Sequence, residues 1–128
     1  MILKKLKLRN FRNIEHCEIH LDPGINVFLG NNGQGKTNCI ESVMFSSTTR
    51  SFRVLNDNAM IKYDCPFASI ECTVEDEGKK FILSSVIHSK GKSLFISSKY
   101  FLDFSFILKT PFLFKLYVNY STYVFICQ

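Results

Sequence analysis

Apolar and polar residues alternate along the middle of the chain, and this period of two predicts β-strands with one buried face. The clearest stretch is residues 67–74, which ends in an acidic turn at residues 75–78. Residues 81–87 are predicted to return as its antiparallel partner, and Lys90-Gly91 forms a further turn toward residues 94–96. The pattern therefore indicates an antiparallel β-meander. In its first strand the predicted core-facing residues are Ala68, Ile70, Cys72 and Val74.

Two further strands are predicted near the start of the chain, at residues 2–8 and 14–21, with a turn over residues 10–13. In the first strand, Leu6 and Leu8 alternate with basic residues, as expected for one buried and one solvated face. The second strand also divides into two faces. They are Cys17, Ile19 and Leu21 on the apolar side, and His16, Glu18 and His20 on the polar side.

A continuous apolar run, residues 25–29, follows the chain-breaking residues 22–24 and predicts a buried strand. After a glycine-rich segment, residues 36–45 predict a helix, because apolar residues recur there at three-to-four spacing. Such spacing is typical of a helix that packs on a sheet. The residues expected to face the sheet are Ile40, Val43 and Met44.

The segment between this strand and this helix, residues 30–37, fits the phosphate-binding pattern G-x-x-x-x-G-K-[ST]. Several backbone N–H groups must approach triphosphate oxygens together, and glycine leaves room because it has no Cβ. Lys36 supplies a cation to the β- and γ-phosphates, Thr37 offers its hydroxyl to Mg²⁺, and the helix N-terminus favours the same anion. The alternative is a glycine-rich turn followed by an incidental helix. The candidate cofactor-binding residues are Gly30, Asn31, Asn32, Gly33, Gln34, Gly35, Lys36 and Thr37.

The chain has 128 residues and a formal net charge of +5 at pH 7, which fits one domain or part of a larger protein. Five of its sixteen basic residues lie within the first twelve positions. This cluster fits a polyanionic partner, or alternatively only the solvated face of the first strand. Residues 46–58 are polar and carry Arg50 and Arg53, so they predict a loop that approaches phosphate or DNA, or one that is only solvated.

Five cysteines, an odd number without a C-x-x-C pair, argue against a disulfide framework and a zinc site. Reduced thiols in the cytoplasm are therefore expected. His16, Cys17 and His20 look like metal ligands, but residues four apart on a strand are separated by about 13 Å. We expect no metal there. The N-terminus interleaves lysine with leucine, so no secretory signal is predicted.

The composition changes near residue 99. Residues 95–128 contain seven of the thirteen phenylalanines and four of the five tyrosines, but only one acidic residue, Asp103. Asp103, Pro111 and two lysines interrupt this stretch, which argues against a membrane span. Basic residues are too sparse for an aromatic platform that binds nucleic acid. We interpret residues 99–128 as a tail that is not the natural continuation of the domain in residues 1–98.

Together these motifs resemble the RecF family, the bacterial DNA replication and repair ATPases of the ABC type that are related to the SMC and Rad50 heads. The resemblance covers roughly residues 1–92, and the Leu-Arg-Asn-Phe-Arg run combined with this phosphate loop is specific. The parts of the chain that carry it are residues 3–13, residues 23–27, residues 30–38, Glu41 and residues 50–53.

The resemblance implies an α/β fold, a partial ABC-type P-loop NTPase head with a mixed sheet, one P-loop helix and an antiparallel β-meander. It implies ATP and Mg²⁺ binding at residues 30–37, with Thr37 on the metal and Arg12 close to the nucleotide. It also implies an ATP-dependent homodimer, binding to single-stranded and gapped duplex DNA, and cooperation with RecR and RecO in recombinational repair and the SOS response. A cytoplasmic location without a membrane partner goes with these functions.

The chain also departs from the family pattern. Phe52 stands where the Ser-His-Arg stretch has His, and neither the ABC signature nor an apolar run ending in Asp-Glu occurs. Phosphoryl transfer depends on such positioned charges, so we expect nucleotide binding without independent turnover and assign no catalytic residue. Part of an ABC core would also leave apolar surface exposed. Alternatives are a non-functional fragment, an SMC- or Rad50-like head, or a small kinase or GTPase, although the Asn-Lys-x-Asp guanine motif is absent.

Overall fold

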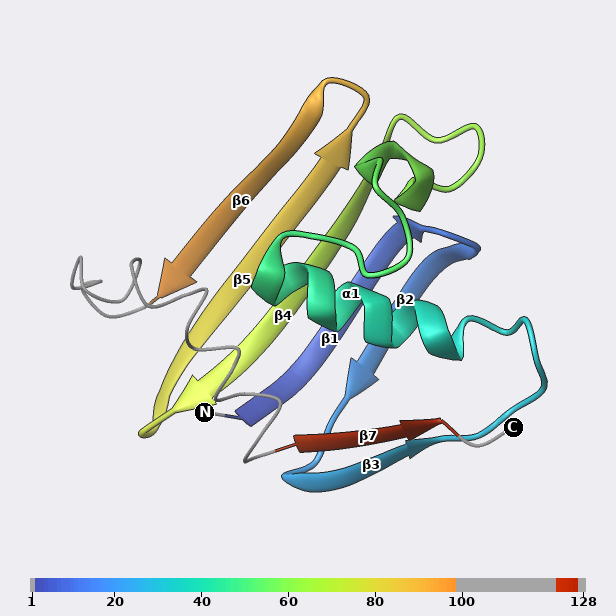
Figure 1. Cartoon of the computed structure of the whole chain (residues 1–128). Helices are drawn as coiled ribbons and strands as arrows, with labels where there is room; N and C mark the ends of the chain where they lie inside the picture. The colour runs from blue at the N-terminus through green and yellow to red at the C-terminus, as the bar shows by residue number, and fades with distance from the viewer. Residues whose placement is uncertain (1, 99–121, 127–128) are drawn as a thin grey trace.

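A computed structural model describes residues 2–98 and 122–126 of the chain. Within these residues a five-stranded sheet, one α-helix, a short 3₁₀-helix and a separate pair of strands are present (Figure 1). In chain order the elements are β1 (Ile2–Phe11), β2 (Ile14–His20), β3 (Gly24–Phe28), α1 (Lys36–Thr48), η1 (Asp57–Met60), β4 (Phe67–Asp76), β5 (Lys79–His88), β6 (Gly91–Ser98) and β7 (Thr122–Ile126).

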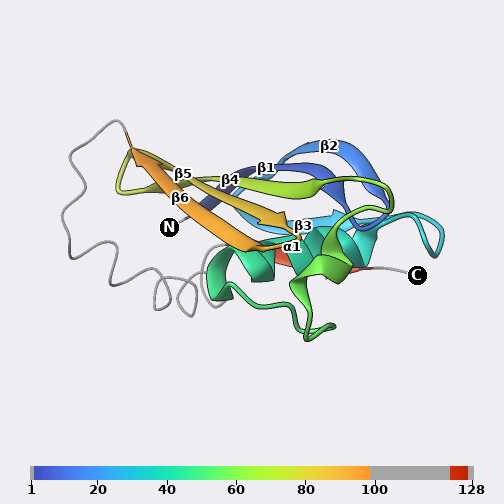
Figure 2. The same ribbon diagram turned by 90° about the horizontal axis from the view of Figure 1, so that it is seen from above.

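The larger sheet has the strand order β2-β1-β4-β5-β6, and every neighbouring pair in it is antiparallel. The predicted β-meander is confirmed as β4, β5 and β6, and the predicted strand pair at the N-terminus is confirmed as β1 and β2. Both α1 and η1 lie on one face of this sheet (Figure 2). Among the described residues, helical structure therefore covers one face of the sheet.

The core lies between the sheet and α1. Leu6 and Leu8 of β1 are each 1% exposed, as the alternation predicted, and they oppose Cys72 and Ile70 of β4. Phe45 of α1 is completely buried. Removing a side chain of this size from water stabilises a fold by about 2 kcal/mol. All four residues predicted to face the core from the meander's first strand are buried: Ala68, Ile70, Cys72 and Val74.

The strand that leads into the phosphate loop differs from the prediction. β3 does not join the five-stranded sheet but pairs with β7 in a parallel, two-stranded sheet (Figure 1). Ile25 is 65% and Val27 50% exposed, so the expectation of a buried strand is wrong. The α/β class with one P-loop helix and a meander is confirmed, while parallel and antiparallel pairing occur in separate sheets. An apolar run indicates only that burial of the strand would be favourable. Whether the strand is buried depends on neighbouring elements that come from elsewhere in the fold.

The helix begins at Lys36 as predicted but ends at Thr48 and presents a different face to the sheet. Ile40, Val43 and Met44 are only half-buried, although Val43 does pack against the core. The expectation that these three form the packed face is therefore wrong in part. Two of the fully buried residues on the helix are polar, and hydrogen bonds satisfy both of them. The buried residues of α1 are Cys39, Glu41, Ser42 and Phe45.

Three basic residues of β1 have partners on neighbouring strands: Lys5, Lys7 and Arg9. Lys5 Nζ lies 2.6 Å from Glu18 Oε1, and Lys7 Nζ lies 3.5 Å from Glu71 Oε1. The guanidinium of Arg9 lies 5.4 Å from the centre of the Phe67 ring. For these three residues the contacts fit the alternative in which they form the solvated face of a strand.

Two negative expectations can be compared with the described residues. Among them, no three His, Cys, Asp or Glu side chains gather where they could hold a metal ion. No helix in the described ranges is long and apolar enough to cross a membrane. The interpretation of residues 99–128 as a tail stays a prediction, because only β7 of that segment belongs to the described residues.

Candidate functional site

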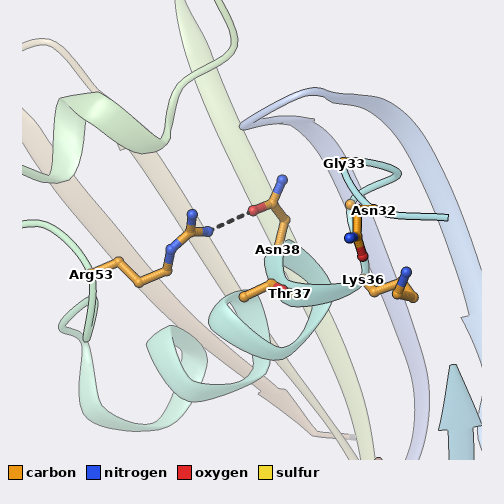
Figure 3. Close-up of a pocket in the computed structure, with 7 residues that line it drawn as sticks. Asn32, Gly33, Lys36, Thr37, Asn38 and Arg53 are labelled. Atoms are coloured by element: carbon orange, nitrogen blue, oxygen red, sulfur yellow. Dashed lines mark hydrogen bonds between the residues drawn. The ribbon is translucent and has the colours of Figure 1, made fainter. Parts of the chain in front are cut away.

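The predicted phosphate loop connects β3 to α1, and its C-terminal half forms a pocket with the start of the helix (Figure 3). The side chain of Arg53, from the segment between α1 and η1, points toward the same region. The structure thus brings part of the predicted loop together with one of the two arginines of the polar segment. The residues that line the pocket are Asn32, Gly33, Gly35, Lys36, Thr37, Asn38 and Arg53.

Two glycines give the loop its shape. Gly33 has φ +81° and Gly35 has φ +95°, a left-handed backbone that residues with a Cβ adopt only at a cost. Gly35 also lies against the turn between β1 and β2. A Cβ at Gly35 would come within 3.2 Å of Ile14 Cγ1 and 3.3 Å of Asn13 Oδ1. Glycine is therefore favoured at residue 35 by both its dihedral angle and its neighbours.

The positive end of α1 opens toward the pocket. Gly35 is the N-cap residue of α1, and no side chain caps the helix there. The first backbone N–H groups of a helix have no partner within the helix and carry a partial positive charge. Together with the glycine-rich loop they form the kind of surface that binds a phosphate group.

Lys36 is held by the loop itself. Its Nζ donates hydrogen bonds to the backbone carbonyls of Gly30 and Asn31, the second at 2.8 Å. Within the same loop, the backbone N–H of Asn31 donates to Gln34 Oε1 at 3.1 Å. These contacts curl residues 30–36 around the ammonium group. The lysine charge consequently lies at the centre of the loop.

A chain of amide groups joins Arg53 to the loop. Arg53 Nη1 donates to Asn38 Oδ1 at 2.8 Å, and Asn38 Nδ2 donates to Asn13 Oδ1 at 2.7 Å. Asn13 Nδ2 in turn donates to the Gly33 carbonyl at 3.0 Å. Three segments that are distant in the sequence are therefore connected at the pocket. Neither asparagine was a predicted site residue, although both lie within the two motifs that carried the family resemblance.

Glu41 of α1 does not line the pocket but contacts Arg53, which does, and it is completely buried. Its carboxylate accepts from Arg12 Nε at 3.0 Å and Arg12 Nη2 at 2.7 Å, a bidentate pair. It also accepts from Ser51 Oγ at 2.5 Å and from Arg53 Nη1 at 3.2 Å. Burial by itself raises the pKa of the Glu41 carboxyl group, but these hydrogen bonds and the two arginine charges outweigh it and hold the pKa below its ordinary value.

Arg12 was predicted to lie close to the nucleotide, and it does not line this pocket. Its remaining nitrogen, Nη1, donates to the Ala59 carbonyl at 2.8 Å, so all three guanidinium nitrogens bind protein acceptors. Arg50 is exposed on the loop after α1 and does not line the pocket either. The role of Glu41 was not predicted. The signal available for it was an acidic residue within a helix that packs on a sheet.

Comparison with known proteins matches this chain to one family and to proteins named for DNA repair. The family model described as "RecF/RecN/SMC N terminal domain" matches residues 2–105. The chain is 42% identical over 92 residues to the DNA replication and repair protein RecF of Limosilactobacillus reuteri, and 38% identical over 118 residues to that of Lactobacillus delbrueckii subsp. bulgaricus. These matches cover 72% and 87% of this chain, but 25% and 31% of the relatives.

Solved structures agree with the fold. The recombination mediator protein RecF-ATPrS in the RecFOR pathway matches with a TM-score of 0.68 and 26% identity, over 73% of this chain and 26% of that one. The SMC head domain from Thermotoga maritima matches with a TM-score of 0.64 and 20% identity, over 77% of this chain and 38% of that one. The second likeness concerns the fold alone. The chain thus spans about a quarter to a third of the length of these RecF proteins.

Proposed function

The chain belongs to the RecF/RecN/SMC N-terminal domain family, and from this membership we propose that it binds ATP at residues 30–37. The observation that carries the proposal is the curled loop around Lys36 at the open N-terminus of α1. A solved RecF relative is named as an ATPrS form, which supports a nucleotide as the ligand.

Each part of the pocket has a chemical role in this proposal. The glycines allow backbone N–H groups to approach the phosphate oxygens, and Lys36 exchanges its loop carbonyls for those oxygens. Arg53 adds a second positive charge on the lining of the pocket. Asn32 and Asn38 add neutral amide groups to the lining. The site is therefore cationic, as a triphosphate requires.

Mg²⁺ is the metal that this chemistry implies. Thr37 lies on the pocket lining, and a hydroxyl group suits Mg²⁺, which usually keeps several waters and phosphate oxygens as its other ligands. The residues present thus fit a metal that the nucleotide brings with it. When bound, the ion would neutralise phosphate charge. Thr37 would hold it, and Lys36 would hold the phosphates.

The biological role proposed for the chain follows from its relatives, which are named DNA replication and repair proteins. We place it in replication and recombinational repair, including the response to DNA damage, with binding to single-stranded and gapped duplex DNA. RecR and RecO are the proposed protein partners, an ATP-dependent homodimer is the proposed assembly, and the cytoplasm is the proposed location. Residues 1–98 are proposed as the part of the ATPase head that carries these functions.

We propose binding without independent turnover. No apolar run ending in Asp-Glu occurs in the chain, so the carboxylate that would orient the attacking water is not supplied by these residues. Phosphoryl transfer needs such positioned charges. Incubation of the purified chain with ATP should release no phosphate above the level of the Lys36→Ala variant, even at saturating nucleotide.

Calorimetric titration with ATP and Mg²⁺ tests the binding site. The Lys36→Ala variant should bind at least about 100-fold more weakly than the unaltered chain, because it loses charge-assisted hydrogen bonds to the phosphates. The variant should still fold and unfold cooperatively, since Lys36 is not part of the core. Lys90→Ala removes an equal charge from an exposed turn and should bind normally. Unchanged binding by Lys36→Ala would show that the loop is not the site.

A further inference from the structure

The buried carboxylate of Glu41 has two cationic partners, Arg12 and Arg53, and they differ in how far the guanidinium group stays exposed to solvent. Arg12 gives both Nε and Nη2 to Glu41, and its third nitrogen is bound by a backbone carbonyl, so its side chain is only 17% exposed. Arg53 gives a single contact at 3.2 Å and its side chain is 42% exposed. Arg12 is therefore saturated by protein acceptors. Arg53 is held but still presents its charge to solvent.

The cluster formed by Arg12, Glu41 and Arg53 leaves an excess positive charge at the pocket. One carboxylate meets two guanidinium groups, so the three side chains together carry one positive charge. Because the bidentate pair with Arg12 compensates the carboxylate, the excess belongs to Arg53. The other partner of Arg53 is the neutral amide of Asn38, which adds no compensating charge.

From this cluster we propose that Glu41 is a positioning residue for the phosphate site. Together with Asn38 it fixes the Arg53 guanidinium at the pocket lining, and it thereby strengthens binding of an anionic ligand that Glu41 does not touch. The proposal rests on the proposed function of residues 30–37 as a nucleotide site.

The physical reason is the cost of ordering an arginine. A free arginine side chain loses rotamer entropy when it binds a ligand, and this loss weakens binding. Ser51 supports the same geometry, because its hydroxyl donates to Glu41 and accepts from the Arg53 backbone amide at 3.0 Å. The Glu41 carboxylate thus orders both the backbone at Arg53, through Ser51, and the Arg53 side chain. The ligand then meets a guanidinium that is already in place.

A double-mutant cycle with ATP and Mg²⁺ tests the proposal on the full chain. Glu41→Gln keeps the size of the side chain but removes its charge, and should weaken ATP binding about 3- to 10-fold. Arg53→Ala should weaken it by a similar or larger factor. In the Arg53→Ala background, Glu41→Gln should cause no further loss, because Glu41 acts through Arg53. Glu18→Gln, which alters an exposed carboxylate paired with Lys5, is the matched control and should bind normally.

Each outcome separates this proposal from the one it rests on. If the unaltered chain binds no ATP, the proposed function fails and this inference falls with it. If it binds, but Glu41→Gln is unchanged, tighter, or equally weakened in the Arg53→Ala background, only the positioning role is overturned. If Glu41→Gln does not give a cooperative thermal transition, Ser51→Ala replaces it in the cycle. It removes one hydrogen bond to Glu41, and its smaller loss of affinity should also disappear in the Arg53→Ala background.

Discussion

At the scale of single residues, the cluster around Glu41 shows why a charged side chain is tolerated in this core. An isolated carboxylate at full burial would favour its protonated form. Two arginines and a serine hydroxyl compensate it, so the ionised form is retained. Removing one partner of such a pair typically costs more than the pair itself contributes, because a buried charge is left uncompensated. Stability and pH are therefore linked through this residue.

The free energy of unfolding should depend on pH through the ionisation of Glu41. Since the pKa of Glu41 is lower in the folded chain than in the unfolded chain, its contribution is present at neutral pH and is lost as the pH falls through the folded-state pKa. At pH 7, Glu41→Gln should reduce the free energy of unfolding by about 3 kcal/mol. Urea titrations of both proteins from pH 7 to pH 3 measure the difference, which should shrink toward acid. A difference that is constant with pH would contradict the ionised pair.

The cysteines provide a second prediction at this scale. Burial, with a smaller influence of the neighbouring Cys17, raises the pKa of Cys39 to about 11. Burial likewise raises the pKa of Cys72 to about 11, against a hydrogen bond with Ser46. At pH 8 only about one thiol in a thousand would be ionised at either site, and the thiolate is the reactive form.

Alkylation by iodoacetamide should therefore follow burial. In the folded chain at pH 8, Cys65 and Cys17, which are half-buried, should react before Cys39 and Cys72. Mass spectrometry of the digested protein identifies the modified sites at successive times. In concentrated urea the four rates should converge. Equal rates in the folded protein would mean that Cys39 and Cys72 are more accessible than the structure has them.

At the scale of elements, the sequence predicted best where local chemistry decides the structure. The alternation in residues 67–74 and the following turn specify β4 and its pairing with β5, because a shift by one residue would turn Ile70 and Cys72 outward. The face of α1 could not be predicted in the same way. Glu41 is tolerated as a buried residue because Arg12, Ser51 and Arg53 reach it, and Arg12 comes from a segment distant in the sequence.

The candidate site divides in the same manner. The local motif consists of the glycines, Lys36 and Thr37, and its chemistry can be predicted from the spacing of these residues in the sequence. The contact between Asn13 and the Gly33 carbonyl depends on how the β1–β2 turn packs beside the loop. No periodicity in the sequence predicts how the β1–β2 turn packs against the loop. The same limitation applies to β3, whose parallel partner β7 begins at residue 122.

The start of α1 gives a prediction about an element boundary. Gly35→Ala should destabilise the fold by about 2–3 kcal/mol, because it combines a left-handed backbone with crowding by Ile14 and Asn13. Gly33→Ala is the matched control, since Gly33 is also left-handed but has nothing within 4 Å of the added Cβ. It should cost only about 1 kcal/mol. Thermal unfolding of both variants measures the difference, and equal losses would contradict the proposed contact with the β1–β2 turn.

At the scale of the whole molecule, several apolar side chains on and just after β3 are exposed. Ile25, Val27 and Leu29 alternate along β3 and its continuation and are 65%, 50% and 76% exposed. Scattered apolar side chains are ordinary on protein surfaces, but a row of them along one strand attracts other chains.

Self-association through this row is the last prediction. The unaltered chain should form oligomers or aggregates in light scattering after size-exclusion chromatography, because contact between copies removes apolar area from water. Ile25→Thr combined with Val27→Thr should shift the protein toward monomer, since threonine keeps the strand preference but adds a hydroxyl. Leu55→Thr, at an exposed loop residue away from β3, should leave the distribution unchanged. A monodisperse, protease-resistant monomer of the unaltered chain would mean that this surface is covered within one molecule.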